Sequence, residues 1–201
     1  SDRTANLSVR GGDPTENMVR VDGVAIPSIG HMAWQGETGG VVSMLSPAAV
    51  QDATFYVAAL PARYGGRLSS ALDIRLREGR RGQPRASGEA SPAGVAGVLQ
   101  GGLPDARGSW IASYRVGLLD MARRPAGLTA APSYRDGHAK FVYDVSASGR
   151  LSAFALIGSS RLTVGRGGTA PTDEFATGRL AVGATWTQLY GGGTRARVTL
   201  S

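Results

Sequence analysis

Hydrophobic and polar side chains alternate along the second half of the chain. Between residues 109 and 118, Trp110, Tyr114 and Val116 fall on one side of the alternation, whereas Ser113 and Arg115 fall on the other. The same pattern recurs at residues 136–147, 150–158, 176–188 and 194–201. A period of two predicts β-strands with one apolar and one polar face. An earlier strand, rich in small residues, is expected at about 93–103.

Four apolar residues interrupt this alternation. Ile111 and Val142 stand among the polar positions of their segments, and Phe154 and Leu156 lie on the more polar face of segment 150–158. The pattern itself gives no reason for them.

The expected connections between these strands alternate in length. Short turns rich in Gly, Ser, Asp or Pro are predicted at 104–108, 146–149 and 190–193, and long loops at 120–135 and 163–175. Trp110, Tyr143 and Trp186 fall on the apolar face close to short turns. Alternating loop lengths and a girdle of amphipathic aromatic residues are typical of outer-membrane β-barrels.

A soluble antiparallel β-sandwich is the alternative for this half, because it also alternates and also uses short turns. Two features count against it. The strands run to about ten residues, near the length that crosses a bilayer at a tilt. Their apolar faces carry mostly Ala, Val and Leu, whereas a sandwich core needs bulkier side chains.

The first 80 residues have a different organisation, in which short apolar segments are separated by Gly, Pro and Asp. Asp22-Gly23 predicts a hairpin between two short strands. Ser46-Pro47 predicts the N-cap and first position of one short helix. Residues 72–76 alternate as a strand, and RRGQPRASG at 80–88 is typical of a linker. We therefore expect a small mixed α/β unit here.

Composition adds limits to this picture. The chain of 201 residues contains no cysteine and has a formal net charge of +7. Disulfides and thiolate metal sites are excluded, and no run of 18 apolar residues predicts a transmembrane helix. The sequence begins at Ser1 without an initiator Met or a signal segment, and six or seven strands do not close a barrel. We therefore expect an internal piece of a longer protein.

Four motifs follow one another through the first 79 residues. They are SVRGG at 8–12, VRVDGVAIP at 19–27, SPAAVQDATFYVAALPARYGG at 46–66 and RLSSALDIRLREG at 67–79. In this order, and followed by alternating hairpins, they resemble the later part of the plug domain and the first barrel strands of a TonB-dependent outer-membrane receptor. Two departures stand out: Ala59-Leu60-Pro61 replaces the usual Lys-Gly-Pro, and the turn at 64–66 is contracted. The ligand therefore does not carry over from better-known members.

The resemblance implies the fold class and the domains. We expect a mixed α/β plug domain at 1–79, a linker and first short barrel strand at 80–92, and N-terminal strands of an antiparallel transmembrane β-barrel at 93–201. The barrel is incomplete and all-β.

The resemblance also implies the function. It predicts a receptor in the outer membrane of a Gram-negative cell that takes up a scarce nutrient, gated by the plug. The ligand class is a ferric siderophore, cobalamin or an oligosaccharide. The implied partners are TonB, acting through a segment missing here, and outer-membrane lipid; no cofactor is implied. The alternative is a non-transporting barrel such as an adhesin or a signalling receptor.

Candidate site residues come from the same resemblance. Loops 28–40 and 61–66 match the apical plug loops, and their candidates for ligand binding are His31, Trp34, Arg63 and Tyr64. The alternative for Trp34 and Tyr64 is packing within the plug. A structural or gating role in the plug is implied for Arg10, Gly11, Gly12, Asp22, Gly23, Gly65 and Gly66. Arg10 is expected to face acidic groups of the barrel wall, and the glycines to serve backbone conformations that other residues disfavour.

The positive charges are scattered rather than clustered, which argues against nucleic acid. Five of them fall on the inferred interior faces of the strands: Arg115, Lys140, Arg179, Arg195 and Arg197. A positive lumen attracts anions, so an anionic ligand is the hypothesis.

An enzyme is not expected. His31 and His138 are the only histidines, and neither a metal-ligand spacing nor a nucleophile elbow is present. Asp136 and His138 share one strand face and are interpreted as a structural pair.

Overall fold

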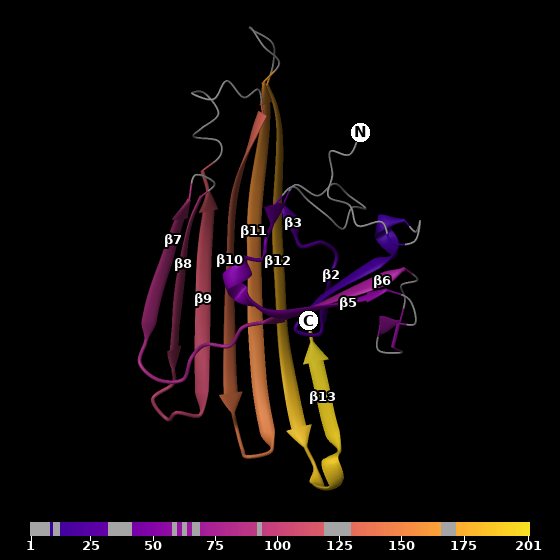
Figure 1. Cartoon of the computed structure of the whole chain (residues 1–201), viewed down its shortest axis with the longest axis vertical. Helices are drawn as coiled ribbons and strands as arrows, with labels where there is room; N and C mark the ends of the chain where they lie inside the picture. The colour runs from indigo at the N-terminus through magenta and orange to yellow at the C-terminus, as the bar shows by residue number, and fades with distance from the viewer. Residues whose placement is uncertain are drawn as a thin grey trace.

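The computed structural model describes residues 9, 13–31, 42–57, 60–61, 64–65, 69–91, 94–118, 130–165 and 172–201. The strands of these residues form a seven-stranded sheet, a four-stranded sheet and one two-stranded ladder (Figure 1). In Figure 1 the four-stranded sheet, formed by the first part of the chain, crosses in front of the long strands.

The second half of the chain forms the seven-stranded sheet, in which each strand pairs antiparallel with its neighbours in sequence. Its strands are β7 (Arg85–Ser91), β8 (Gly94–Gly102), β9 (Gly108–Gly117), β10 (Ala130–Asp144), β11 (Gly149–Gly165), β12 (Thr172–Leu189) and β13 (Arg195–Leu200). Short turns join β8 to β9, β10 to β11 and β12 to β13, all at the lower end in Figure 1. The antiparallel order and these three turns confirm the predictions from alternation. In the described part of the chain, β7 and β13 are the two edges.

Three central strands are longer than the sequence predicts. β10, β11 and β12 contain 15, 17 and 18 residues. β10 begins at Ala130, inside the loop expected at 120–135, and β12 begins at Thr172, inside the loop expected at 163–175. Those two loop boundaries are wrong because alternation marks only the part of a strand with one apolar face, whereas backbone pairing continues beyond it.

The four-stranded sheet, called here the N-terminal sheet, has the order β2-β1-β6-β5. It consists of β1 (Asn17–Val21), β2 (Val24–Ile26), β5 (Val50–Val57) and β6 (Ser70–Leu76), with β1 and β6 parallel. The predicted hairpin and the strand at 72–76 are confirmed. Asp22 and Gly23 form the β1–β2 turn with φ of 48° and 91°, the left-handed values that two-residue hairpin turns require.

The short helix expected after Ser46 does not form. Ser46 Oγ accepts a hydrogen bond from Ala48 N, and Pro47 occupies the first position, as predicted. However, the helical turn η2 (Pro47–Ala49) ends after three residues, and Val50 begins β5. The segment that follows contains Val50, Thr54 and Val57 and pairs with β6. The β-branched side chains and the backbone pairing with β6 together stabilise a strand more than a continued helix would be stabilised by its single first turn.

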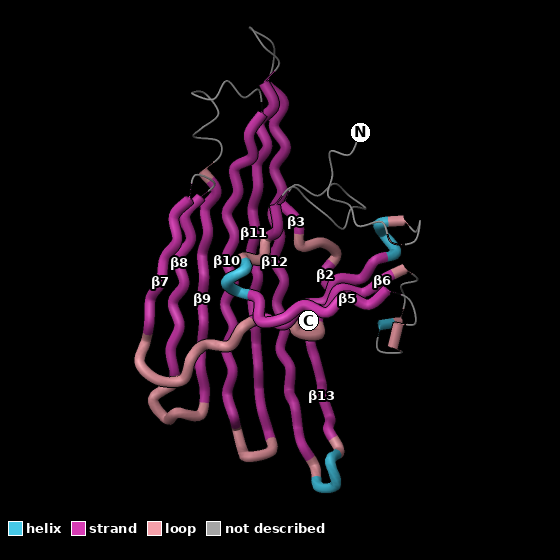
Figure 2. Tube along the Cα trace, viewed as in Figure 1, coloured by secondary structure: helices cyan, strands magenta, loops and turns pink. Residues whose placement is uncertain are grey.

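The other helical structure in the described ranges is of the 3-10 type, at η1 (Pro14–Glu16), at η4 (Gly191–Gly193) and at Tyr64 (Figure 2). The described residues include no α-helix, so the expected mixed α/β class is wrong for the described part of the first 79 residues. None of the helical turns in these ranges is long and apolar enough to cross a membrane.

The N-terminal sheet lies against one face of the seven-stranded sheet, called here the inner face; the opposite face is the outer face. Phe154 and Leu156 of β11 join a buried cluster with residues of the N-terminal sheet such as Val21 and Val24. Ile111 and Val142, each 1% exposed, point to the same inner face. The four residues that interrupt the alternation are therefore buried on the face that the first part of the chain covers.

Candidate functional site

Charged residues meet at the contact between the two sheets. On the inner face, β10 presents Asp136, His138 and Lys140 at every second position, and Arg115 of β9 lies directly opposite Asp136. Asp136, His138 and Lys140 are between 3% and 7% exposed. Burying such groups costs several kcal/mol each unless partners compensate, so their partners determine what this contact can do.

Lys140 holds the turn between β1 and β2. Its Nζ lies 2.9 Å from Oδ2 of Asp22 and donates a hydrogen bond of 2.8 Å to the carbonyl oxygen of Leu76. Asp22 Oδ1 in turn accepts from Leu76 N. The side chains of Lys140 and Asp22 are 7% and 13% exposed. One cation of the large sheet thus fixes both the β1–β2 turn and the end of β6.

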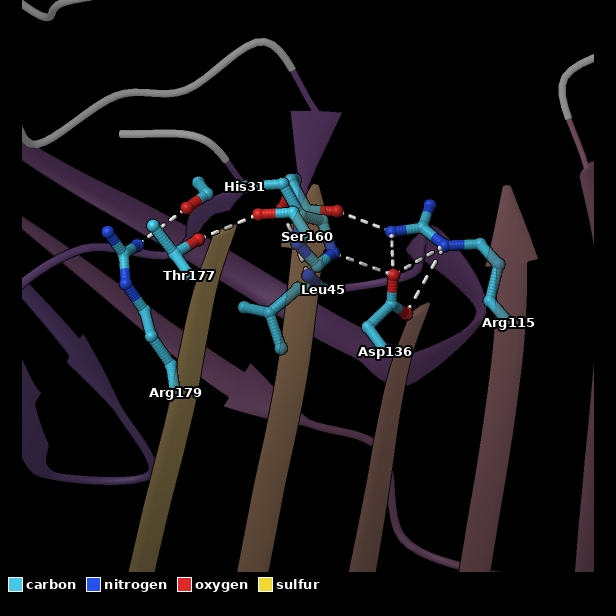
Figure 3. Close-up of polar contacts among 9 residues, drawn as sticks. His31, Leu45, Arg115, Asp136, Ser160, Thr177 and Arg179 are labelled. Atoms are coloured by element: carbon cyan, nitrogen blue, oxygen red, sulfur yellow. Dashed lines mark hydrogen bonds and ion pairs between the residues drawn. The ribbon is translucent and has the colours of Figure 1, made fainter. Parts of the chain in front are cut away.

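Asp136 holds the second connection (Figure 3). Its Oδ2 lies 3.1 Å from Nε2 of His31 and 2.7 Å from a terminal guanidinium nitrogen of Arg115. Arg115 also donates from Nε to both carboxylate oxygens and from a terminal nitrogen to the carbonyl of Ser43. The Arg115 guanidinium lies over the Tyr134 ring at 5.2 Å. Asp136 and Arg115 together therefore bind the ladder of β3 (Gly30–His31) and β4 (Val42–Ser43), with Asp136 at His31 and Arg115 at Ser43.

A third connection comes from β12. Arg179 donates a hydrogen bond of 2.6 Å to the carbonyl oxygen of Gly30, next to His31 (Figure 3). Beside it, the hydroxyls of Ser160 and Thr177 are 2.8 Å apart. The short β3–β4 ladder is thus bound by residues from β9, β10 and β12.

Small residues on the inner face allow this close approach. A Cβ on Gly183 would lie 2.6 Å from Val24 Cγ2 and 2.6 Å from Phe154 Cε1. A Cβ on Gly158 would lie 2.4 Å from Cε of Met44. The backbone of the large sheet is therefore in direct contact with the first part of the chain.

Exposed ion pairs attach the segment after β6. Arg150 pairs with Glu78 and lies 3.6 Å from Asp144, and Arg81 also pairs with Asp144. Exposed pairs of this kind contribute up to about 1 kcal/mol each. They connect the segment after β6 to the large sheet but add little to its stability.

The structure describes two of the four candidate ligand residues. His31 is 2% exposed and contacts Asp136. Tyr64 is 1% exposed, its hydroxyl donates to Asp73 at 2.6 Å, and its ring packs against Tyr56. Both side chains thus make interior contacts. Trp34 and Arg63 lie outside the described residues.

Of the residues with an implied structural role, Asp22 and Gly23 form the turn that Lys140 holds, and Gly65 lies in an exposed turn. Arg10, Gly11, Gly12 and Gly66 lie outside the described residues. The contact expected between Arg10 and acidic groups of the barrel wall is therefore untested. In the pair seen here the acid, Asp22, lies in the hairpin turn and the cation, Lys140, on the large sheet.

Sequence reasoning missed Asp136 and Lys140 as partners of His31 and Asp22. A signal was present, because charges at positions 136, 138 and 140 repeat on one strand face. Alternation assigns such a face to an interior, but it cannot say which residues from a distant segment meet each charge.

Ser113 and His138 form the one side-chain contact that resembles part of a catalytic triad in the described ranges. Ser113 Oγ contacts His138 Nδ1, whereas Asp136 binds His31 and Arg115 instead. His138 therefore has no carboxylate to orient it, as a triad requires. The described residues also hold no group of three His, Asp or Glu side chains arranged for a metal ion.

No protein-family model matches the chain, and no curated protein matches it. Solved structures do. The siderophore receptor PirA from Acinetobacter baumannii matches with a TM-score of 0.60 and 16% identity, over 92% of this chain and 31% of that one. The ferripyoverdine receptor of the Pseudomonas aeruginosa outer membrane matches with a TM-score of 0.56 and 11% identity, over 91% and 27%. A variant of the ferric enterobactin receptor PfeA from the same organism gives 0.55 and 15%, over 89% and 31%.

The chain therefore shares its fold with part of these siderophore receptors. It spans less than a third of the length of these receptors. At this identity, the likeness concerns the fold.

Proposed function

We propose that this chain is part of a TonB-dependent outer-membrane receptor that takes up a scarce nutrient, with the plug at 1–79, a linker and first strand at 80–92 and barrel strands at 93–201. The observation that carries this is the N-terminal sheet seated on the inner face through the buried pair of Lys140 and Asp22. A sheet that only anchors an adhesin has no need to bury charges against a separate small sheet.

The outer face supports the membrane part of the proposal. It exposes large apolar side chains, including Leu180 at 70%, Leu200 at 70% and Leu99 at 53%. Trp110, Tyr143 and Trp186 lie on this face near the short turns, where a lipid-facing barrel places its aromatic girdle. A contiguous apolar face of this extent needs a lipid or protein cover.

The buried ion pairs suit a removable plug. A charge pair in a dry contact holds strongly when both partners are present, yet each charge is well solvated once water enters. A pull on the chain before β1 would be transmitted to the β1–β2 turn and to the pair of Lys140 with Asp22. We propose that release of this pair opens the path through the barrel.

The ligand class follows from the charges that remain on the inner face. Arg115 and Lys140 are paired with acids, and Arg179 binds the carbonyl of Gly30. Arg195 and Arg197 of β13 are exposed. We therefore base the hypothesis of an anionic ligand, such as a ferric chelate or an acidic glycan, on these two arginines. Binding by loops 28–40 and 61–66 also remains part of the proposal.

The test is uptake by cells that make or lack the protein, with TonB present or deleted. Labelled ferric chelates, cobalamin and acidic or neutral oligosaccharides are supplied separately. We expect one ligand class to enter only when both the protein and TonB are present. Uptake that does not depend on TonB would contradict a receptor of this kind. No uptake together with adherence of the cells to surfaces would also contradict it and would favour the adhesin.

A matched pair of variants tests the charge hypothesis. Replacing Arg195 and Arg197 by Gln should reduce uptake of an anionic ligand several-fold, because an inner-face field raises the local anion concentration. Replacing the exposed Arg135 and Arg161 of the outer face by Gln is the control for charge loss elsewhere. Equal uptake by both variants and the wild type would rule out the anionic ligand without affecting the receptor proposal.

A further inference from the structure

A groove on the outer face is lined by residues of four adjacent strands. Its volume is ≈ 480 Å³, and its lining includes Tyr114 of β9, Arg135 of β10, Ile157 of β11 and Leu180 of β12. The strand register places Tyr114, Gly137, Ile157 and Leu180 in one row across the sheet. The next row contains Arg135, Ser159 and Gly178.

Gly178 contributes to the hollow, whereas Gly137 is covered by the apolar row. Gly137 lies between Tyr114 and Ile157, whose side chains stand within 3.3 Å of where its Cβ would be. A Cβ on Gly178 would meet nothing within 4 Å. The missing side chain of Gly178 leaves open space in the row that contains Arg135.

The two rows mark a change of polarity along the outer face. Below them, toward the short turns, β10 to β12 expose residues such as Phe141, Leu151 and Val182. Arg135 is exposed, and Arg161, also exposed, lies beside it because it pairs with Ser133 on β10. The described residues give Arg135 no ion-pair partner. The groove thus combines an apolar floor with a cationic rim.

The depth of this rim matches a lipid headgroup, given the proposed membrane location on which this inference rests. Arg135 is eight residues from Tyr143 of the aromatic girdle, or roughly 26 Å along the strand. At a tilt of ~40° this corresponds to about 20 Å of height, close to the ~25 Å apolar band of an outer-membrane barrel. Arg135 therefore stands at the opposite edge of the band.

We propose that this groove binds one phosphorylated lipid of the surrounding membrane. The Arg135 guanidinium binds the headgroup phosphate, for which its planar donor pair is suited, and the Ser159 hydroxyl lies in the same row. An acyl chain lies over Gly178, against Tyr114, Ile157 and Leu180. The lipid is held by charge complementarity at one end and by apolar contact along the other.

The experiment uses the intact protein in nanodiscs of phosphatidylcholine with a small fraction of phosphatidic acid as the phosphorylated probe. Native mass spectrometry counts the lipids that stay bound after release from the disc. We expect one phosphatidic acid per protein to be retained in preference to phosphatidylcholine. Arg135→Gln should weaken this retention roughly tenfold, as expected for loss of a charge-assisted hydrogen bond.

Gly178→Leu should also reduce retention, because the new side chain fills the hollow. The matched control is Gly88→Leu: Gly88 lies on β7, in the row across the sheet that contains Tyr114 and Gly137, and has ordinary space for a Cβ, 3.6 Å from the Ala96 carbonyl. Arg85→Gln controls for loss of an exposed charge. Neither control should change retention.

Two outcomes would overturn the inference. One is equal retention of both lipids, which would show that the protein holds surrounding membrane lipids without preference for a phosphorylated headgroup. The other is an equal loss in the Gly178→Leu and Gly88→Leu variants. A protein that holds neither lipid would instead contradict the proposed membrane location, and uptake by the Arg135→Gln variant should equal that of the wild type.

Discussion

Lys140 on β10 and Asp22 in the β1–β2 turn form a buried ion pair, with Nζ 2.9 Å from Oδ2, between segments that lie far apart in the sequence. The pair joins the large sheet, which supplies the cation, to the β1–β2 turn. Few residue types adopt the left-handed backbone conformation of that turn.

Removing the cation should destabilise the contact strongly. Lys140→Met leaves the Asp22 carboxylate buried without its partner, which costs roughly 3–5 kcal/mol. We expect a lower urea concentration at which a protease has cleaved half of the molecules within residues 13–76. The double variant Lys140→Met with Asp22→Asn should recover part of the loss, since no buried charge then remains. Strict additivity of the two substitutions would mean that the pair does not couple the sheets.

Asp136 should matter more than Asp144 on the same strand. Asp136→Asn weakens contacts to His31 and Arg115 in a buried setting, with an expected loss on the order of 3 kcal/mol. Asp144→Asn removes the ion pairs of a side chain that is 30% exposed, so the expected loss of stability is about 1 kcal/mol or less. The same protease assay ranks them. Equal losses would contradict a role for Asp136 in holding the β3–β4 ladder.

Two glycines on β12 should respond oppositely to enlargement. Gly183→Val places methyl groups against Val24 and Phe154, where even a Cβ would approach to 2.6 Å, so we expect a loss of roughly 1–3 kcal/mol from overpacking. Gly178→Val enters open space on the outer face and should leave the stability unchanged. Thermal unfolding of the two variants in detergent measures the difference; a tolerant Gly183 would mean that the sheets are not in contact there.

A substitution at Tyr64 distinguishes a packing role of this residue from a role in ligand binding. Tyr64→Phe keeps the ring but removes the 2.6 Å hydrogen bond to Asp73, which should cost about 0.5–1.5 kcal/mol of stability and leave uptake unchanged. Tyr190→Phe, at an exposed position, is the control. Lower uptake at unchanged stability would instead support the ligand-binding role predicted for Tyr64.

The turn before β9 should be sensitive to acid. The backbone N–H of Arg107 and then the hydroxyl of Tyr143 hydrogen-bond to Asp105, and they hold the pKa of its carboxyl below 3.8. Because the folded pKa is lowered, this stabilisation is fully present above the unfolded value of 3.8 and is lost as the pH falls through the folded pKa. A carbon-detected NMR titration of the Asp105 carboxyl should show the lowered midpoint, and an ordinary midpoint would contradict these hydrogen bonds.

The large sheet was the most predictable part of the fold. The alternation at Trp110, Tyr114 and Val116 gave the strand, its faces and the short turn before it, since an interface between two media imposes a period of two. The strand ends at Ala130 and Thr172 were not predictable, because beyond the apolar band only backbone pairing holds the ladder. The helix expected after Ser46 failed for a related reason: the pairing of Val50 with β6 lies outside any local pattern.

The candidate site was predictable only in its parts. Sequence placed Asp136 and Lys140 on an inward strand face and placed Asp22 in a hairpin turn. It did not join them, because a charge selects its partner by distance and burial, and these depend on how two sheets pack.

The sequence by itself determined the alternation of faces, the turns and the hairpin, since each depends on residues close together in the chain. The tertiary structure alone decided that Asp22 meets Lys140, that His31 meets Asp136, and that Phe154 and Leu156 are buried where alternation expects polar side chains. The physical reason is that desolvation and ion pairing act between surfaces brought together from distant segments, and no local pattern records which surfaces meet.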